Sequence, residues 1–173
     1  MVDVPGFDIR FSTFEDGLAL EKWLDSPGML HWFPMSAGKE LQESIQNWIG
    51  FSRFNASLTA VAGGTPCGIG TLFLMPYQKV AHECLFKLIV DPARQRQGIG
   101  RSLMENLMHL AKNRFQLEFM HTDVVEGNPI LHLLEGLGFY QVLKQDKFFK
   151  DDGRYFARHL VECDLRNWRP HGK

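Results

Sequence analysis

The segment from Leu85 to Leu107 constrains this chain most, because it joins a strand, a glycine-rich turn and a helix without interruption. Its sequence is LFKLIVDPARQRQGIGRSLMENL. An apolar, β-branched run ends at Asp91-Pro92, a loop of Arg and Gln leads to Gly98 and Gly100, and an amphipathic helix follows. The N–H groups of the loop and first helical turn lack carbonyl partners, and the helix dipole adds partial positive charge. This order predicts a site for a phosphate-bearing ligand.

Two common phosphate loops are excluded by single positions. A Walker A loop needs Gly-Lys-Ser/Thr, but Arg101 follows Gly100, and a dinucleotide-binding loop needs a third glycine where Leu103 stands. The pattern that remains is Gln95-x-x-Gly98-x-Gly100 after Val-Asp-Pro. It resembles the acetyl-CoA signature of the GNAT acetyltransferase superfamily. The alternative is an ordinary strand-to-helix turn that is rich in Gly and Arg.

Composition sets the class of the chain. With 173 residues, 45% of them hydrophobic, the chain is expected to form one compact α/β domain, which we place at residues 7–166. A formal net charge of -1 argues against a nucleic-acid-binding protein. Basic residues gather only locally, at Arg94, Arg96 and Arg101, which suits one small anionic ligand.

The cysteines and the hydropathy of the chain indicate the cellular compartment in which the protein is expected. Cys67, Cys84 and Cys163 are widely spaced and odd in number, so we expect reduced, buried thiols and no metal site. No run of 18 apolar residues predicts a membrane span, and the N-terminal sequence MVDVPGFDIR lacks the features of a secretory signal. A cytoplasmic protein without membrane contact is expected. A homodimer is one option for its oligomeric state.

Periodicity and turn signals predict the order β-α-α-β-β-β-α-β-α-β-β. Strands are expected near residues 7–11, 58–61, 68–75, 81–90, 117–125, 139–149 and 155–164. Helices are expected near 18–24, 39–55 and 101–115, and from Asn128 to Gly136 or Gly138. This order resembles the GNAT fold, an α/β (α+β) acyl-CoA N-acyltransferase fold with a mixed sheet of about seven strands and four helices. Asn128 followed by Gly138-Phe139 is similar to a second family signature. Within the superfamily, the chain is nearest in pattern to RimI-type N-terminal acetyltransferases.

The resemblance implies how acetyl-CoA would bind as co-substrate. In the family, the strand before the loop separates from the next strand, and its free backbone binds pantetheine as an added strand would. Carried over, Leu88, Ile89 and Val90 would bind pantetheine and offer an N–H to the thioester oxygen. Arg94 or Arg96 would reach the remaining phosphate, and Asn128 would hydrogen-bond the pantetheine arm. The pyrophosphate would lie on the backbone of Gln95, Arg96, Gln97, Gly98, Ile99, Gly100 and Arg101.

The acid and base are assigned only through the resemblance. RimI-type enzymes carry a Glu five residues before the Asn, and this chain has Asp123 there, one methylene shorter, so it would act through water. The alternative is a solvated strand-end carboxylate. Glu83 is the second candidate base. His121 shares a strand face with Asp123 and is expected to be a packed residue.

The helix after Asn128 departs from the family pattern. The family has Leu-Tyr before Gly-Phe, with Tyr protonating the leaving thiolate, whereas this chain has Leu133-Leu134. Three interpretations follow: the thiolate leaves unassisted or takes a proton from water, Tyr140 or Tyr155 substitutes, or activity is lost and the ligand site retained. The predicted function is an acetyl-CoA-dependent N-acetyltransferase, in which a primary amine of a peptide, protein or small molecule attacks the thioester directly. The alternative is a catalytically impaired acyl-CoA-binding or sensing protein.

The acceptor amine is not identified by the sequence. A peptide acceptor needs an open groove between the segments Gly28–Pro34 and Phe148–Asp152. A cationic small amine needs an acidic pocket instead. Candidate contributors to such a pocket are Glu15, Asp16, Glu40 and Glu43.

Overall fold

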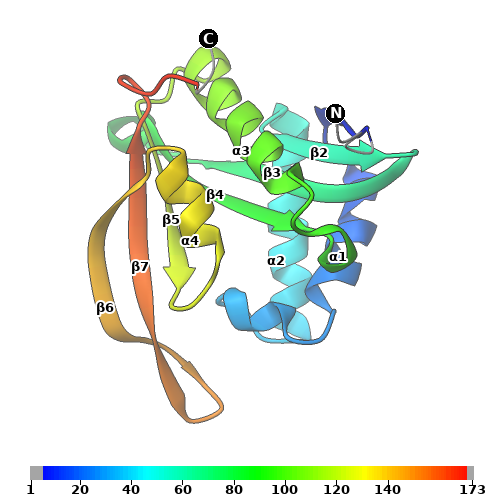
Figure 1. Ribbon diagram of the computed structural model, residues 1–173, viewed down its shortest axis with the longest axis vertical. Coiled ribbons are helices and arrows are strands. Elements are labelled where there is room, and N and C mark those ends of the chain that lie inside the picture. Colours follow the sequence, from blue (N-terminus) through cyan, green and yellow to red (C-terminus); the bar gives the residue numbers. More distant parts are fainter. Residues whose placement is uncertain (1–5, 171–173) are drawn as a thin grey trace.

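The computed structural model describes residues 6–170 and contains one seven-stranded mixed sheet with two helices on each face (Figure 1). Its spatial order is β1-β2-β3-β4-β5-β7-β6, and only the β4–β5 pair is parallel. The strands are β1 (Asp8–Phe11), β2 (Ser57–Ala62), β3 (Thr65–Leu74), β4 (Glu83–Val90), β5 (Phe119–Val125), β6 (Tyr140–Asp151) and β7 (Arg154–Asp164). The helices are α1 (Gly17–Leu24), α2 (Lys39–Gly50), α3 (Ile99–His109) and α4 (Ile130–Gly136). The element order and fold class predicted from sequence are confirmed.

Element boundaries differ from the sequence-based prediction mainly at helix ends. Helix α3 begins at Ile99 rather than Arg101, because Gly98 adopts φ +82° and the first-turn N–H groups need no helical partner. After His109 the chain continues as a π-helical turn, Leu110–Arg114. Helix α2 ends at Gly50 and a 3-10 turn continues to Phe54.

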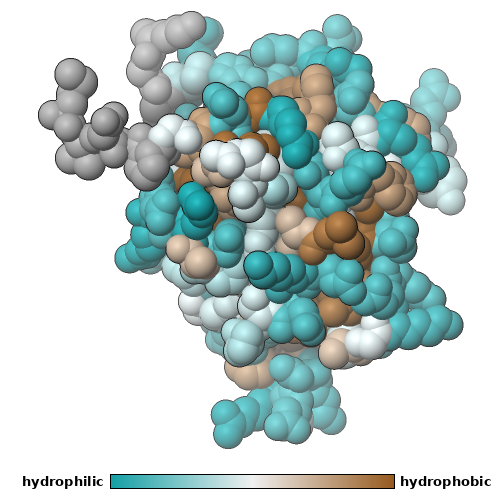
Figure 2. Space-filling view, turned by 90° about the vertical axis from the view of Figure 1, so that its right-hand side faces the viewer, coloured by the Kyte–Doolittle hydropathy of each residue, from teal (hydrophilic) through white to brown (hydrophobic). Residues whose placement is uncertain are grey.

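Two hydrophobic clusters lie on opposite faces of the sheet. Helices α3 and α4 pack on one face through Leu103, Leu107 and Leu134, and α1 and α2 pack on the other through Leu24 and Trp48. On the face shown in Figure 2, hydrophobic residues form scattered patches among hydrophilic ones. This distribution is expected for helices whose apolar sides pack against the sheet.

Helix α3 lies close against β3 because β3 carries glycine at the contact. A Cβ at Gly68 would lie 2.7 Å from Leu103 Cδ1 and 3.2 Å from Ile99 Cγ2. A larger residue there would require the side chains of Leu103 and Ile99 to shift. This contact helps to fix the position of the glycine-rich loop above the end of β4.

A fork opens in the sheet between β4 and β5. Strand β4 pairs with β3 from Cys84 to Val90, but it pairs with β5 only from Glu83 to Leu85. Beyond Leu85, the edge of β4 that faces β5 has no strand partner. The resemblance to the GNAT fold implies this separation, which leaves backbone groups of β4 free beside the glycine-rich loop.

A chain of buried polar side chains runs between α1, α2 and the first three strands. It passes in order through Trp48, Thr71, Ser57, Ser12, Thr59 and Asp16, with neighbouring polar atoms 2.6–3.0 Å apart. Trp48 only donates and the Asp16 carboxylate only accepts, so each hydroxyl can donate to the next. Asp16 also accepts two hydrogen bonds from Arg10, at 2.7 and 2.9 Å, and one from the Thr13 N–H at 2.8 Å. The sequence analysis did not predict this network.

The cysteines are buried and free, as predicted. Burial raises the pKa of Cys84 to about 12 and that of Cys163 to about 11, so both thiols stay protonated near neutral pH. Within residues 6–170, no helix has the length and apolar character needed to cross a membrane. Residues 1–5, which begin the segment inspected for a secretory signal, lie outside the described residues.

Candidate functional site

The loop between β4 and α3 is shaped by short-range bonds and two left-handed residues. Asp91 accepts a hydrogen bond from the Ala93 N–H at 3.0 Å and starts the turn. Arg96 has φ +65° and Gly98 has φ +82°. Ser102 is the first α3 residue whose N–H bonds back along the helix, to the Gly98 carbonyl at 3.1 Å. The N–H groups of Ile99, Gly100 and Arg101 therefore remain available to an anion.

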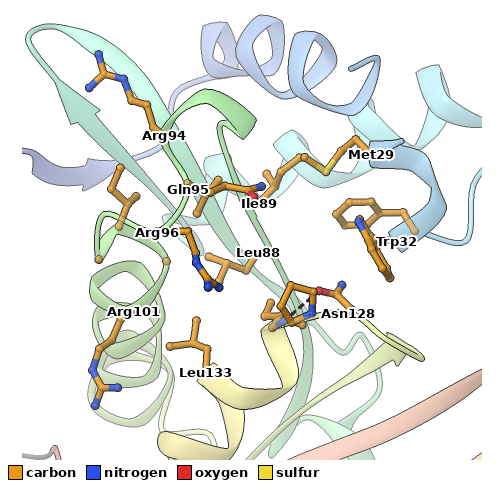
Figure 3. A pocket seen from close by; sticks show the side chains of 17 residues that line it. Met29, Trp32, Leu88, Ile89, Arg94, Gln95, Arg96, Arg101, Asn128 and Leu133 are labelled. Carbon is orange, nitrogen blue, oxygen red and sulfur yellow. Dashed lines mark hydrogen bonds between the residues drawn. The ribbon is translucent and has the colours of Figure 1, made fainter. Parts of the chain in front are cut away.

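A cavity of about 590 Å³ lies over this loop and the free edge of β4 (Figure 3). Its lining includes every cofactor-binding residue predicted from the sequence except Gln97, which lies within the loop itself. These residues are Leu88, Ile89, Val90, Gln95, Arg96, Gly98, Ile99, Gly100, Arg101 and Asn128. The sequence analysis assigned Met29, Trp32 and Phe33 only to an acceptor groove, and it did not assign Pro129, Ile130 and Leu133 to the cofactor site. The aromatic residues within 29–33 are the sequence signal for this part of the cavity wall, but their spacing does not show which cavity they line.

The side chains of the arginines in and after the loop point in different directions. Figure 3 shows Arg96 pointing into the cavity toward Leu88, while Arg94 and Arg101 point away from its centre. Arg101 Nε is also engaged by Glu105 Oε1 at 3.1 Å, one helical turn later. Arg96 is therefore the arginine best placed to meet an anion inside the cavity.

Asn128 and helix α4 form the wall across the fork. The Asn128 side-chain oxygen accepts a hydrogen bond from the N–H of Ile130, the first residue of the helix, at 3.1 Å, and Pro129 between them occupies the N-cap position. This leaves the Asn128 amide N–H₂ to donate toward a ligand. Of the two leucines at the family's Leu-Tyr position, Leu133 lines the cavity and Leu134 is fully buried in the core.

A second cavity, of about 390 Å³, lies between the segment after α1 and the tip of the β6–β7 hairpin. The two segments predicted to flank an acceptor, Gly28–Pro34 and Phe148–Asp152, both contribute to its lining. Phe33 lines this cavity and the first one. The two cavities thus share a wall at Phe33.

The comparisons with known proteins agree with this arrangement. The sequence model of the acetyltransferase (GNAT) family matches residues 20–139, more than half of the chain. The chain belongs to this GNAT acetyltransferase family. No curated protein matches the GNAT chain in sequence at a significant level.

Solved structures similar to this GNAT protein establish its fold. An N-acetyltransferase from Staphylococcus aureus Mu50 superposes with a TM-score of 0.81 at 16% identity, covering 92% of this chain and 99% of that one. The structure of yncA from Salmonella typhimurium with its cofactor acetyl-CoA gives 0.79 at 18% identity, covering 96% and 98%. A ribosomal-protein-alanine N-acetyltransferase from Brucella melitensis gives 0.77 at 20% identity, covering 91% and 99%.

The three catalytic candidates lie outside the lining of both cavities. Asp123 on β5 accepts from Arg158 Nη1 at 3.3 and 3.5 Å, and it shares a sheet face with Val125, which lines the second cavity. Glu83 lies at the closed end of the fork, opposite Phe119. Tyr140 donates to Glu162 at 2.7 Å, which raises the pKa of the phenol to about 12. A phenol held this way is a weaker acid toward a thiolate than a free one.

The four acids considered for an acidic pocket do not converge on either cavity. Asp16, one of the candidate contributors to such a pocket, is 3% exposed and belongs to the buried network, so it does not contribute to one. Glu40 accepts from the Ser36 N–H at 2.9 Å, and Glu43 pairs with Lys39 at 3.6 Å. Glu15 lies beside Asp16, on the turn before α1. Among the described residues, these acids form no site for a polycationic amine.

Proposed function

We propose that this GNAT protein is an acetyl-CoA-dependent N-acetyltransferase whose domain spans residues 7–166. The acetyl group passes from the thioester to a primary amine by direct attack. The observation that carries this proposal is the shared wall at Phe33, because it joins a cavity suited to acetyl-CoA to a second cavity beside the hairpin tip. The acceptor would occupy the second cavity.

The residues of the first cavity fit acetyl-CoA. The unpaired edge of β4 at Leu88–Val90 offers backbone groups to the pantetheine arm, and an N–H there would polarise the thioester carbonyl. The loop from Gln95 to Arg101 offers N–H groups to the pyrophosphate, with Arg96 as countercharge. When bound, acetyl-CoA supplies an acetyl group with a thiolate as leaving group.

We assign proton removal to Asp123, acting through a water molecule, because its strand face leads to the second cavity. The amine must be neutral to attack, and most primary amines are protonated near pH 7. Tyr140 takes no part in this proposal because its proton is held by Glu162. Thiolates are modest bases, so the leaving group departs unassisted or takes a proton from water.

The proposal is tested by thiol release from acetyl-CoA with two acceptor pools. One pool holds short peptides varied at the N-terminus and at Lys, and the other holds polyamines, amino acids and aminoglycosides. Release that depends on an acceptor from either pool establishes a transferase. Absence of thiol release with both pools, in a protein that binds acetyl-CoA in calorimetry, overturns the proposed transferase activity in favour of an acyl-CoA-binding or sensing role.

Replacing Arg96 by glutamine is expected to weaken acetyl-CoA binding about 10- to 100-fold, because a charge-assisted hydrogen bond contributes about 1.5–3 kcal/mol. Arg53→Gln is the matched control, since Arg53 is exposed on the turn after α2 and lines neither cavity. It is expected to change the dissociation constant less than about threefold. Calorimetry at two salt concentrations measures both variants, and an equal loss in the two would remove the special role of Arg96.

Replacing Asp123 by asparagine is expected to lower kcat about 100-fold, the ordinary contribution of a general base, and to change the pH–rate profile. Acetyl-CoA affinity is expected to stay unchanged, because Asp123 lies outside the cofactor cavity. Glu83→Gln serves as the comparison, with an expected change below about threefold. A pH profile that Asp123→Asn leaves intact would move the role to Glu83 or to water.

A further inference from the structure

The second cavity is walled mainly by apolar and aromatic side chains. Apart from His31, Ser36, Lys150 and Asp151, every residue that lines it is apolar. Phe149 on β6 and Phe156 on β7 lie directly opposite one another, so their rings share the hairpin face that looks into the cavity. His31 packs edge-on against Phe156, with ring centroids 4.8 Å apart. An acceptor placed here meets these aromatic rings together with polar atoms of the lining.

Cations and carboxylates occur together around this cavity. The Lys150 ammonium lies 5.4 Å from the Tyr155 ring, and this pair occupies the hairpin face opposite Phe149 and Phe156. Arg154 stands directly across the hairpin from Asp151. Asp123, on the neighbouring strand β5, forms an ion pair with Arg158. Asp151 is the single carboxylate among the lining residues, so the lining offers one anionic side chain to an ammonium of the acceptor.

Lys87 adds positive charge on the same face of the sheet. Its Nζ lies 5.4 Å from the Trp48 ring centroid and 5.1 Å from that of Phe73. Burial lowers the pKa of this ammonium, and no neighbouring carboxylate offsets the effect. Lys87 shows that aromatic rings on this face of the sheet accommodate one ammonium group.

We propose that the acceptor is a primary amine with a single positive charge and an apolar or aromatic group next to the nitrogen, and that Phe149 and Phe156 bind this group. This inference rests on the proposed transferase function. Two sources supply the chemistry, a free arylalkylamine or a peptide whose first residue is apolar. Polyamines and aminoglycosides lack this combination of one positive charge and an apolar or aromatic group next to the nitrogen.

The test compares kcat/KM for phenethylamine, a peptide that begins with Phe, a peptide that begins with Ser, and spermidine, at saturating acetyl-CoA. Either apolar acceptor is expected to exceed the Ser peptide and spermidine by about 10-fold or more, the discrimination that an apolar pocket ordinarily gives. Phenethylamine leading would identify a free amine as the source, and the Phe peptide leading would identify a peptide. Both results support the inference.

Phe156→Ala is expected to lower kcat/KM for the preferred apolar acceptor about 10-fold or more and for the Ser peptide less than about threefold. Phe149→Ala, on the neighbouring strand, repeats the test should the first variant fold poorly. Phe54→Ala is the matched control, because Phe54 is 55% exposed and lines neither cavity. Acetyl-CoA affinity, measured by calorimetry, is expected to stay the same in all three variants.

Two results would overturn the inference while leaving the transferase intact. One is turnover led by spermidine, and the other is a Phe156→Ala variant that lowers turnover of all acceptors by the same factor. Absence of turnover with every acceptor, in a protein that binds acetyl-CoA, would overturn the proposed function and the inference together. The binding measurement and the acceptor series therefore separate the two failures.

Discussion

A Gly98→Val variant is expected to bind acetyl-CoA at least about 100-fold more weakly than the wild type. Gly98 has φ +82°, where a β-branched residue carries backbone strain of about 1–3 kcal/mol. A Cβ built there meets no protein atom within 4 Å, so the added side chain projects into open space at the start of α3. Any change that relieves the strain also turns the N–H groups of Ile99 and Gly100 away from an anion, and each tenfold loss of affinity corresponds to about 1.4 kcal/mol.

Gly64→Val provides a control with the same backbone strain. Gly64 also has φ +82°, but it lies in the β2–β3 turn and lines no part of the cofactor cavity. Both variants are expected to lose thermal stability, and only Gly98→Val to lose binding in calorimetry. Micromolar acetyl-CoA binding by a folded Gly98→Val protein would contradict the assignment of the loop.

The order of elements was predictable because its signals are local. The apolar strand before Asp91, the glycines and the helical periodicity from Ile99 to Leu107 each follow from neighbouring residues. The same holds for the Asn128-Pro129 helix start, where the Asn128 side chain accepts a hydrogen bond from the Ile130 N–H. Most of the predicted cofactor-binding residues line one cavity for this reason, since they come from one continuous segment.

Features that depend on packing between distant segments were not predictable. Trp32 lines the cofactor cavity because the turn after α1 folds across the free edge of β4. Leu133 rather than Leu134 faces the cavity because the rotation of α4 is set by its packing on the sheet. Asp16 resembled a surface acid next to a helix start, yet its partners Thr59 and Arg10 come from strands on either side of it in sequence. The contact between Asp16 and Thr59 spans 43 residues, and such a contact leaves no periodic pattern in the sequence.

The second large effect concerns stability: Asp16→Asn is expected to lower the free energy of unfolding by about 2–3 kcal/mol. Asp16 is 3% exposed and accepts hydrogen bonds from Arg10, Thr13 and Thr59. Loss of the charge leaves the Arg10 guanidinium without its carboxylate and replaces an acceptor by an N–H₂ group within a fixed hydrogen-bond chain. Because the Arg10 side chain is partly exposed, the expected loss of unfolding free energy is smaller than that for a fully buried ion pair. In a domain of this size it corresponds to a fall in Tm of about 4–12 °C.

The pH dependence identifies the ionised carboxylate as the cause. Burial alone raises the pKa of Asp16, but hydrogen bonds from Arg10, Thr13 and Thr59 outweigh it and hold that pKa below its ordinary value. A depressed pKa in the folded state contributes stability above the unfolded pKa of about 4, and this contribution is lost as the pH falls through the folded value. The difference in unfolding free energy between wild type and Asp16→Asn should therefore be constant from pH 5 to 8 and shrink below about pH 4. Urea unfolding across this range measures it, with the exposed acid in Asp25→Asn as control. A difference that persists unchanged at low pH would assign the loss to packing, because the carboxylate charge would then contribute nothing.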